Sequence, residues 1–328
     1  MLCLCAIASA WSQKFEYGVD FGAFFDNREC DSYYCDNRTE FLTKLQPEIG
    51  VSILNRQHRI MGGVAWIQPV GNGWRDYKLC PTVYYEFRNS VWHFAFGMLP
   101  RNKMKEEMPK YLMSDSLSRY QPNIRGLVLQ YTKPHGYAEV MLDWRQLQSE
   151  TQREAFNINF NTKWQFGKIF FGGHLQLNHL ACSKNPTTEQ YVNDDITVNP
   201  FVGVNLSQAT PLDTLSFELG PIVNLERNRG TNGWKTPAGA LFNAAAQWKG
   251  LGLRQSVFAG KNLYPLYPEV GAQLNMGEPY FQSPIYSRSD LYYKFFFNKY
   301  VNLELCLSFH VAQKAFGFRQ QLSLNFKI

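Results

Sequence analysis

The sequence predicts an all-β protein, a single antiparallel transmembrane β-barrel of about sixteen strands. Three observations predict this class. Apolar and polar residues alternate over long runs, the runs recur along nearly all of the 328 residues, and short and long connections alternate between them. Period two places alternate side chains on opposite faces of a sheet. One face of each strand then suits hydrocarbon and the other suits water, as in barrels that cross a membrane.

The end of the chain shows the alternation most clearly. The apolar sets are Val301, Leu303, Leu305, Leu307, Phe309 and Val311, then Phe316, Phe318, Leu322, Leu324, Phe326 and Ile328. Glu304, Arg319 and Lys327 lie on the alternate face, which must therefore be wet. Strands of soluble sandwiches also alternate. However, these runs have about ten residues, the length of a tilted membrane strand, whereas soluble strands average about five or six.

Along the chain, the alternation predicts sixteen strands. They cover residues 15–25, 48–55, 58–70, 81–88, 91–99, 124–131, 137–145, 155–162, 168–178, 196–206, 215–225, 240–248, 253–261, 290–297, 301–311 and 316–328. A long polar loop is expected from the first strand to about residue 46. Short turns such as 56–57 alternate with longer loops, except in the last hairpin, where 312–315 is short. An even strand number places both termini on the short-turn, periplasmic side and the long loops outside the cell. Residues 14–328 therefore form one barrel.

Composition and charge exclude other classes. Aromatic residues are abundant, with 25 Phe, 18 Tyr and 8 Trp, as expected if rings mark both membrane interfaces. No run approaches the ~18 consecutive apolar residues of a membrane helix. The net charge of +6 is modest and shows no basic stripe, so nucleic acid is not an expected partner. The predicted location is the cell outer membrane, with its lipid and lipopolysaccharide as partners.

The first ten residues, MLCLCAIASA, read as a signal peptide. They are apolar and end in Ala8-Ser9-Ala10, which matches a small-residue cleavage site. The usual charged start is missing, so we interpret the segment as truncated, with cleavage after Ala10 or after Gln13 at the latest. In an oxidising compartment, Cys30 and Cys35 could form a local disulfide. No cysteine pair has metal-ligand spacing with histidines, so we expect neither a metal nor a cofactor.

At this level the chain resembles a general porin of Gram-negative outer membranes. The resemblance rests on the strand count, the loop asymmetry and the apolar terminal strand, although the last residue, Ile328, is not aromatic as it usually is in such barrels. It implies a channel for passive or weakly selective diffusion of small hydrophilic solutes. It also implies that the barrel could form a homotrimer.

In porins, the loop between strands five and six folds into the lumen and narrows it. The corresponding residues here are 100–122, for which a short helix is plausible around 103–115, interrupted by Pro109. The candidate constriction residues in this loop are Arg101, Lys103, Lys105, Glu106, Glu107, Asp115 and Arg119. Opposed charges of this kind would orient polar solutes. The alternative is a solvated surface loop.

The inner strand faces add further candidates for lining the pore. These are Arg59, Glu86, Arg145, Arg254, Arg288, Glu304 and Arg319. Acid and base are nearly balanced over the whole predicted lumen face, so strong selectivity for either ion sign is not expected. A second long loop, 262–287, carries Tyr264, Tyr267, Tyr280, Phe281 and Tyr286 among prolines and glycines. Such rings can stack on a sugar, but we favour loop packing.

The histidines do not form a recognisable catalytic motif. None of the six lies in an HExxH or GxSxG context, and Ser308 and His310 share a strand face as chance allows. We therefore assign no catalytic residue and predict that the protein is not an enzyme. Two alternatives to the channel stay open, namely a loop-occluded barrel acting as an adhesin or scaffold and an outer-membrane hydrolase.

Overall fold

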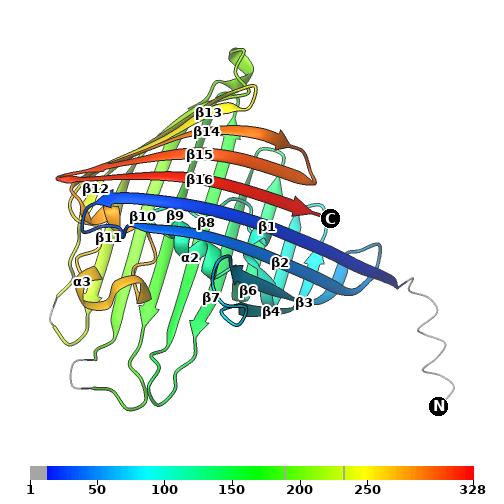
Figure 1. Cartoon of the computed structure of the whole chain (residues 1–328), viewed down its shortest axis with the longest axis horizontal. Coiled ribbons are helices and arrows are strands. Elements are labelled where there is room, and N and C mark those ends of the chain that lie inside the picture. Colours follow the sequence, from blue (N-terminus) through cyan, green and yellow to red (C-terminus); the bar gives the residue numbers. More distant parts are fainter. Residues whose placement is uncertain (1–12, 188–189, 232) are drawn as a thin grey trace.

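A computed structural model describes residues 13–187, 190–231 and 233–328, so the predicted signal peptide lies outside the described residues. The chain forms a closed barrel of sixteen antiparallel strands (Figure 1). The strands are β1 (Lys14–Asp31), β2 (Arg38–Ile53), β3 (His58–Pro69), β4 (Lys78–Arg88), β5 (Trp92–Pro100), β6 (Asn123–Lys133), β7 (Gly136–Gln146), β8 (Ala155–Phe166), β9 (Ile169–Leu180), β10 (Asn193–Asn205), β11 (Thr214–Asn228), β12 (Ala238–Trp248), β13 (Leu251–Gly260), β14 (Ile285–Phe297), β15 (Val301–Ala312) and β16 (Ala315–Lys327). Every strand pairs with its sequence neighbours, and β1 closes the barrel on β16.

Each predicted strand matches one observed strand, but the first connection is much shorter than expected. The predicted loop up to residue 46 is mostly strand, because β1 runs to Asp31 and β2 begins at Arg38. The pairing of Asp26 with Glu40 continues the ladder there. The inner face carries charged residues here, and the outer face mixes polar Asn27 and Thr39 with apolar Phe41, so the apolar alternation that identified the other strands is interrupted.

The two ends of the barrel differ as predicted. One end carries the chain termini and the short connections, of which 54–57 and 249–250 are tight turns. Leu54, Asn55 and Arg56 adopt φ of 52°, 54° and 67°, the left-handed conformation that tight hairpins use. The other end carries the long connections 101–122 and 261–284, together with 147–154, 181–192 and 229–237. The last hairpin is short as predicted, since Ala312 pairs with Ala315. It is not the single exception, because the connection 32–37 at this end is also short.

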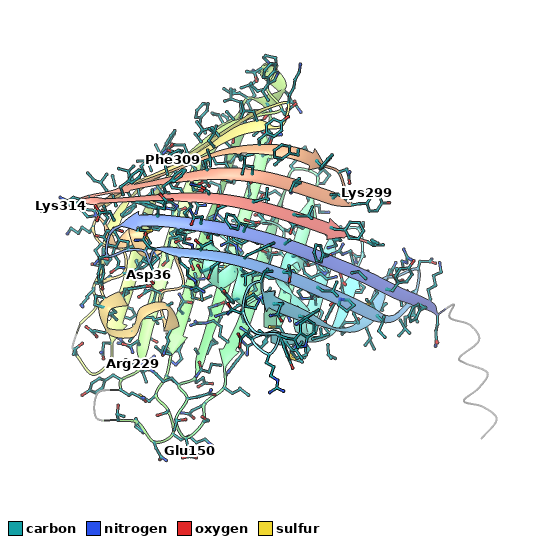
Figure 2. All side chains as sticks on the ribbon, viewed as in Figure 1. Asp36, Glu150, Arg229, Lys299, Phe309 and Lys314 are labelled. Atoms are coloured by element: carbon teal, nitrogen blue, oxygen red, sulfur yellow. A yellow bond between two sulfur atoms is a disulfide. The ribbon has the colours of Figure 1, made fainter. Side chains whose placement is uncertain are left out.

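The outer surface of the strands is apolar. On β15, the side chains of Leu305, Phe309 and Val311 are 39%, 36% and 50% exposed, whereas Ser308 and His310 are fully buried. Phe309 points away from the barrel (Figure 2). In the described ranges, no helix is long and apolar enough to cross a membrane.

The densest core lies inside the barrel, where two connections pack against the inner wall. Short helical segments mark them: η1 (Arg101–Lys103) and α2 (Asp115–Tyr120) in 101–122, and α3 (Tyr267–Val270), η3 (Gly271–Gln273) and η4 (Pro279–Gln282) in 261–284. A further segment, η2 (Ser207–Ala209), lies in a turn. The core joins loop residues such as Leu112 and Phe281 to wall residues such as Ile124 and Phe258.

Candidate functional site

The connection 101–122 enters the lumen, where α2 is seen inside the barrel (Figure 1). Arg101 fixes the start of the connection: its guanidinium donates to the Asp143 carboxylate at 2.7 Å and to the main-chain oxygens of Gln121 and Asn123. Ser114 caps α2 by accepting from a backbone N–H. The helix predicted around 103–115 is wrong, since α2 begins only at Asp115, after Pro109 and its neighbours have turned the chain.

The connection 261–284 packs on the first one and fills the same section of the lumen. The Tyr264 hydroxyl donates to the main-chain oxygen of Tyr111 at 2.5 Å, and the Glu278 N–H donates to that of Lys110 at 2.7 Å. Tyr264, Tyr280 and Phe281 are at most 2% exposed. These rings therefore serve packing here, and the two loops close much of the cross-section with apolar side chains.

Asp115 is the centre of a buried charge network between α2 and the wall. Its carboxylate lies 2.7 Å from Lys110, 3.0 Å from Arg288 and 3.4 Å from Arg319. Glu278 accepts from Arg319 at 3.3 Å and from the Asp115 N–H at 3.0 Å. Burial alone would raise the pKa of Asp115, but the surrounding cations outweigh it and hold that pKa well below its usual value.

A second network joins α2 to β1 and β2. The Arg28 guanidinium donates to Asp26 at 2.7 Å and to the Ser116 hydroxyl at 2.9 Å, and it lies 3.4 Å from Glu40. Arg119 lies 3.5 Å from Asp26. Arg38 also pairs with Glu40 and donates to the Tyr120 hydroxyl, so three arginines share two carboxylates. Every charge in this cluster is paired with an opposite one, so the cluster anchors the loop and is a poor candidate for a reactive centre.

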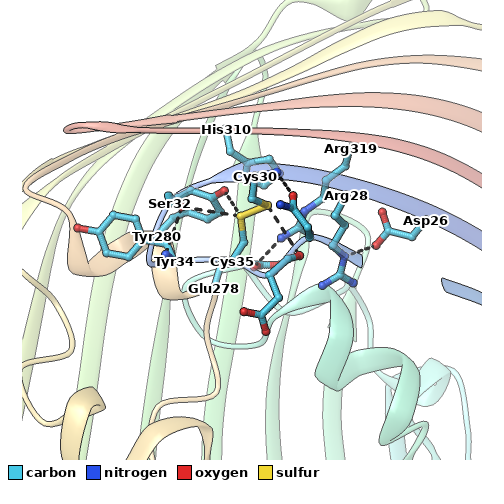
Figure 3. The surroundings of a disulfide bond; sticks show 12 residues. Asp26, Arg28, Cys30, Ser32, Tyr34, Cys35, Glu278, Tyr280, His310 and Arg319 are labelled. Atoms are coloured by element: carbon cyan, nitrogen blue, oxygen red, sulfur yellow. Dashed lines mark hydrogen bonds and ion pairs between the residues drawn. A yellow bond between two sulfur atoms is a disulfide. The ribbon is translucent and has the colours of Figure 1, made fainter. Parts of the chain in front are cut away.

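Cys30 and Cys35 are disulfide-bonded and close the 32–37 connection (Figure 3). The Tyr280 hydroxyl lies 2.8 Å from the Cys35 sulfur, and its ring stacks on His310 with centroids 4.8 Å apart. His310 in turn bonds the Tyr286 hydroxyl at 2.7 Å. The disulfide thus packs against the second inward loop.

The other predicted lumen residues form separate pairs, and the structure does not gather them into one ring. Their contacts are Arg59 and Lys103 with Glu86 at 3.1 Å each, Arg254 with Glu304 at 2.6 Å, Glu106 with Lys163 at 3.7 Å, Glu107 with Lys110 at 3.6 Å, Arg145 with the Gln273 oxygen at 2.7 Å, and the Lys105 N–H with Glu139 at 2.9 Å. Below the loops a cavity of about 810 Å³ remains, lined by charges of both signs, among them Arg119 and Glu304.

A different group of polar residues lies on the outer surface, near the long-loop ends of β7 to β11. Trp144, Phe156, His179, Asp194 and Arg227 are direct cross-strand partners in this order, and we call them the outer row. Ring centroids are 5.1 Å apart between Trp144 and Phe156 and 5.0 Å between Phe156 and His179. Nδ1 of His179 lies 2.9 Å from Oδ1 of Asp194, and Arg227 lies 3.4 Å from Oδ2.

The connection between β11 and β12 extends the outer row. Arg229 donates to both oxygens of Asp194, at 2.8 and 3.0 Å, and the Arg227 guanidinium lies 4.8 Å from the centre of the Trp234 ring. Two guanidinium groups therefore share one carboxylate. The site keeps a positive charge even when His179 is neutral.

The next outward row toward the periplasm is entirely aliphatic. Its members, again direct partners, are Leu142, Ile158, Leu177, Ile196 and Leu225. Aliphatic side chains suit the hydrocarbon of the bilayer, and Trp with charged groups suits its polar boundary. The outer row therefore has the composition expected at a boundary between headgroups and acyl chains, and it lies at the long-loop end of the barrel.

The His179–Asp194 pair has the geometry of a histidine oriented by a carboxylate. When Nδ1 donates to Asp194, Nε2 is left as the basic atom and can take a proton from water. His93 and Glu86 form a similar pair, 2.9 Å apart, but inside the lumen, where a membrane lipid has no access. Among the described residues, no three His, Cys, Asp or Glu side chains are placed to hold a metal ion.

Sequence reasoning missed the outer row because the predicted strands ended too early. Residues 168–178 stop one residue before His179, and 196–206 start two residues after Asp194. The signal that was overlooked is the alternation of side-chain faces along each strand. His179 follows the outward-facing Leu177 by two positions, and Asp194 precedes the outward-facing Ile196 by two, so both polar residues fall on the face that is apolar elsewhere.

Residues 7–328 match the model of a protein family described as lipid A 3'-O-deacylase-type. A comparison with curated proteins finds no similar sequence. Because the matching family is one of enzymes and covers nearly the whole chain, the prediction that the protein is not an enzyme is wrong. The absence of short sequence motifs was uninformative, since residues on different strands can assemble a catalytic pair that no local spacing reveals.

The fold is similar to those of several outer-membrane proteins of known structure. OprB of Pseudomonas putida is 8% identical, with 96% of this chain and 94% of that chain covered and a TM-score of 0.52. OpdK of Pseudomonas aeruginosa, solved with vanillate, is 12% identical, with 96% and 98% covered and a TM-score of 0.53. OmpT of Vibrio cholerae, in a trimer form, is 6% identical, with 97% and 100% covered and a TM-score of 0.57. The predicted barrel class, its porin-like architecture and the outer-membrane location are confirmed.

Proposed function

We propose that this chain, which belongs to the lipid A 3'-O-deacylase-type family, hydrolyses an acyl ester of lipid A in the outer leaflet. The observation that carries this proposal is the position of the His179–Asp194 pair. It faces outward and lies one row beyond the aliphatic belt, on the extracellular side. The ester of an O-acylated lipid lies where the headgroup meets its chains, so substrate and pair would meet at the same depth.

The side chains of the outer row can supply the chemistry of ester hydrolysis. Nε2 of His179 takes a proton from a water molecule as the water oxygen attacks the acyl carbonyl carbon. Arg227 and Arg229 provide positive charge for the oxyanion that forms on the carbonyl oxygen. When the intermediate collapses, the carbon–oxygen bond to the sugar breaks and the protonated His179 returns the proton to the leaving alkoxide. The products are a fatty acid and a sugar hydroxyl.

Asp194 acts through its neighbours. Its carboxylate fixes the orientation of His179 through Nδ1 and holds the two guanidinium groups beside the imidazole. Trp144 and Phe156 give the imidazole a stacked wall at the level of the first acyl carbons. Such a surface would hold a lipid by its chains while the polar end of the row faces the sugar.

The experiment is hydrolysis of purified lipid A in mixed micelles, with released fatty acid measured by mass spectrometry. His179→Gln should lower the rate at least about 100-fold, the typical contribution of a general base. His93→Gln is the matched control, because it disrupts the histidine–carboxylate pair of the lumen and should leave the rate unchanged. If His179→Gln keeps the parent rate, or if both variants lose activity equally, the outer row is not the reactive site.

Passage of small solutes and assembly into trimers remain proposals. The 810 Å³ cavity supports a water-filled lower lumen, whereas the packed loops above it favour a closed or narrow state. Single-channel recording in planar bilayers would decide between them, because an open pore gives discrete conductance steps and a plugged barrel gives none. The size of the detergent-solubilised protein would test the trimer.

A further inference from the structure

A second cavity, of about 500 Å³, lies in the lumen among β3, β4, β5 and β6 and is bounded by the first turn of the inward loop. Its lining contains five cationic side chains: Arg59, Arg88, Lys103, Lys105 and Lys327. In the part of the chain that the structure describes, no carboxylate side chain lines it. The 810 Å³ cavity differs, because Asp115, Asp290 and Glu304 are among its lining residues.

Glu86 lies behind the lining and is fully buried. It is 3.1 Å from Arg59, 3.3 Å from Arg88 and 3.1 Å from Lys103, and its fourth partner, His93, is 2.9 Å away. One carboxylate thus serves three permanent cations. It fixes the positions of their side chains while neutralising only one of their charges.

The excess of positive charge around this cavity remains when the nearest other carboxylates are counted. Lys327 lies 3.8 Å from Asp20, and Glu139 accepts from the backbone N–H of Lys105. Five cations against Asp20, Glu48, Glu86 and Glu139 leave a net charge of one positive unit with His93 neutral. Arg59 Nε is buried and has no hydrogen-bond partner, so one strong donor beside the cavity is unused. Unpaired cationic groups in a restricted lumen attract an anion strongly, because screening there is weaker than in open water.

The cavity also offers neutral donors at the short-turn end. Ser90 and Thr132 line it beside Arg88, and His93 bonds Gln130 at 2.7 Å. Arginine matches the planar or tetrahedral oxygen arrays of carboxylates and phosphates better than it matches a monatomic ion. The volume is also within the range of small-molecule sites, which is about 300–1,000 Å³.

We propose that this cavity binds a small polyanion carrying at least two phosphate or carboxylate groups, which enters the lumen from the periplasmic side. The turn 89–91 lines the cavity and belongs to the end that carries the chain termini, so this is the end that opens toward the periplasm. The site is independent of the outer row, since it faces the lumen instead of the lipid. Its failure would leave the proposed hydrolysis untouched.

Titration calorimetry on the full-length protein in detergent micelles tests this proposal, with pyrophosphate and citrate as separate probes. Binding of either probe should weaken as salt rises, because the attraction is electrostatic. Arg88→Gln should weaken binding about tenfold or more, as expected for a charged hydrogen bond. Arg88→Lys keeps the charge and should lose less. Binding by pyrophosphate alone would assign the site to phosphates, and binding by citrate alone to carboxylates.

Arg254→Gln is the matched control, because Arg254 forms a one-to-one pair with Glu304 elsewhere in the lumen. It should leave the dissociation constants of both probes unchanged. The proposal is overturned if neither probe binds at millimolar concentration, or if Arg88→Gln and the parent bind equally. It is also overturned if Arg254→Gln weakens binding as much as Arg88→Gln does. Heat-modified gel mobility shows whether each variant is a folded barrel before titration.

Discussion

At the residue scale, the role of a side chain depends more on which face of its strand it occupies than on its residue type. Two residues separated by one position on β15, Leu305 and Leu307, face outward, while Cys306 and Ser308 between and after them are buried. The same alternation of faces along a strand puts His179 on the lipid side and His93 on the lumen side. A histidine is therefore interpretable only once its strand face is known.

The lipid-facing assignment of Leu305 predicts a large and specific loss of stability. Leu305→Arg should cost about 2–4 kcal/mol if the residue lies near the midplane, because a cation must then leave water for hydrocarbon. Urea titration of the protein folded into vesicles measures this change in the free energy of unfolding. Ser323→Arg, on the lumen face of β16 beside the 810 Å³ cavity, should cost much less. Equal stability of Leu305→Arg and the parent would refute the assignment.

Asp115 predicts a pH dependence of loop docking. Its pKa is lowered on folding, so its stabilising contribution is fully present above the unfolded value of about 3.9 and is lost only as pH falls through the lower folded value. We expect the connection 101–122 to stay protected from hydrogen exchange at pH 5 and to open well below pH 3.9.

Asp115→Asn should uncover the same connection at neutral pH, at a cost of about 3–5 kcal/mol, because Lys110, Arg288 and Arg319 then lose their shared anion. Ser118→Ala, on the same helix, is the control. An Asn variant with parent-like protection would show that packing alone holds the loop.

At the element scale, the inward connection 101–122 was predictable from its place in the strand order, and its contacts were not. Counting strands located the loop and its charges. The sequence could not show that Asp115 meets Arg288 and Arg319, because those partners are more than 170 positions away. Nor could it show that a second connection, 261–284, would pack on the first.

The packed loops predict a gain of conductance on deletion. Removing residues 103–115 takes out Tyr111, Leu112 and Met113, which are at most 4% exposed in the lumen. Single-channel conductance should then rise clearly above that of the parent. Deletion of residues 72–75, in the connection between β3 and β4, serves as the control and should leave it unchanged. No increase on deleting 103–115 would mean that 261–284 closes the lumen by itself.

At the scale of the whole molecule, the barrel was predictable because its period-two pattern repeats in every strand, including the closing pair. The wrong prediction concerned activity. The side chains of the proposed reactive site lie on β9, β10 and β11, and only the register of the closed sheet brings His179, Asp194 and Arg227 into one row. The sequence also could not show how charge is distributed in the lumen. Acidic and basic residues are nearly balanced over the whole lumen face, but the fold gathers five cations around one cavity.

The proposed activity of this barrel is removal of an acyl chain from lipid A in the outer leaflet. The most direct test is the mass spectrum of lipid A extracted from outer membranes of cells that produce the protein, compared with cells that produce His179→Gln. We expect lipid A lighter by one acyl group with the parent protein and intact lipid A with the variant. Intact lipid A in both, with the parent folded in the outer membrane, would contradict it.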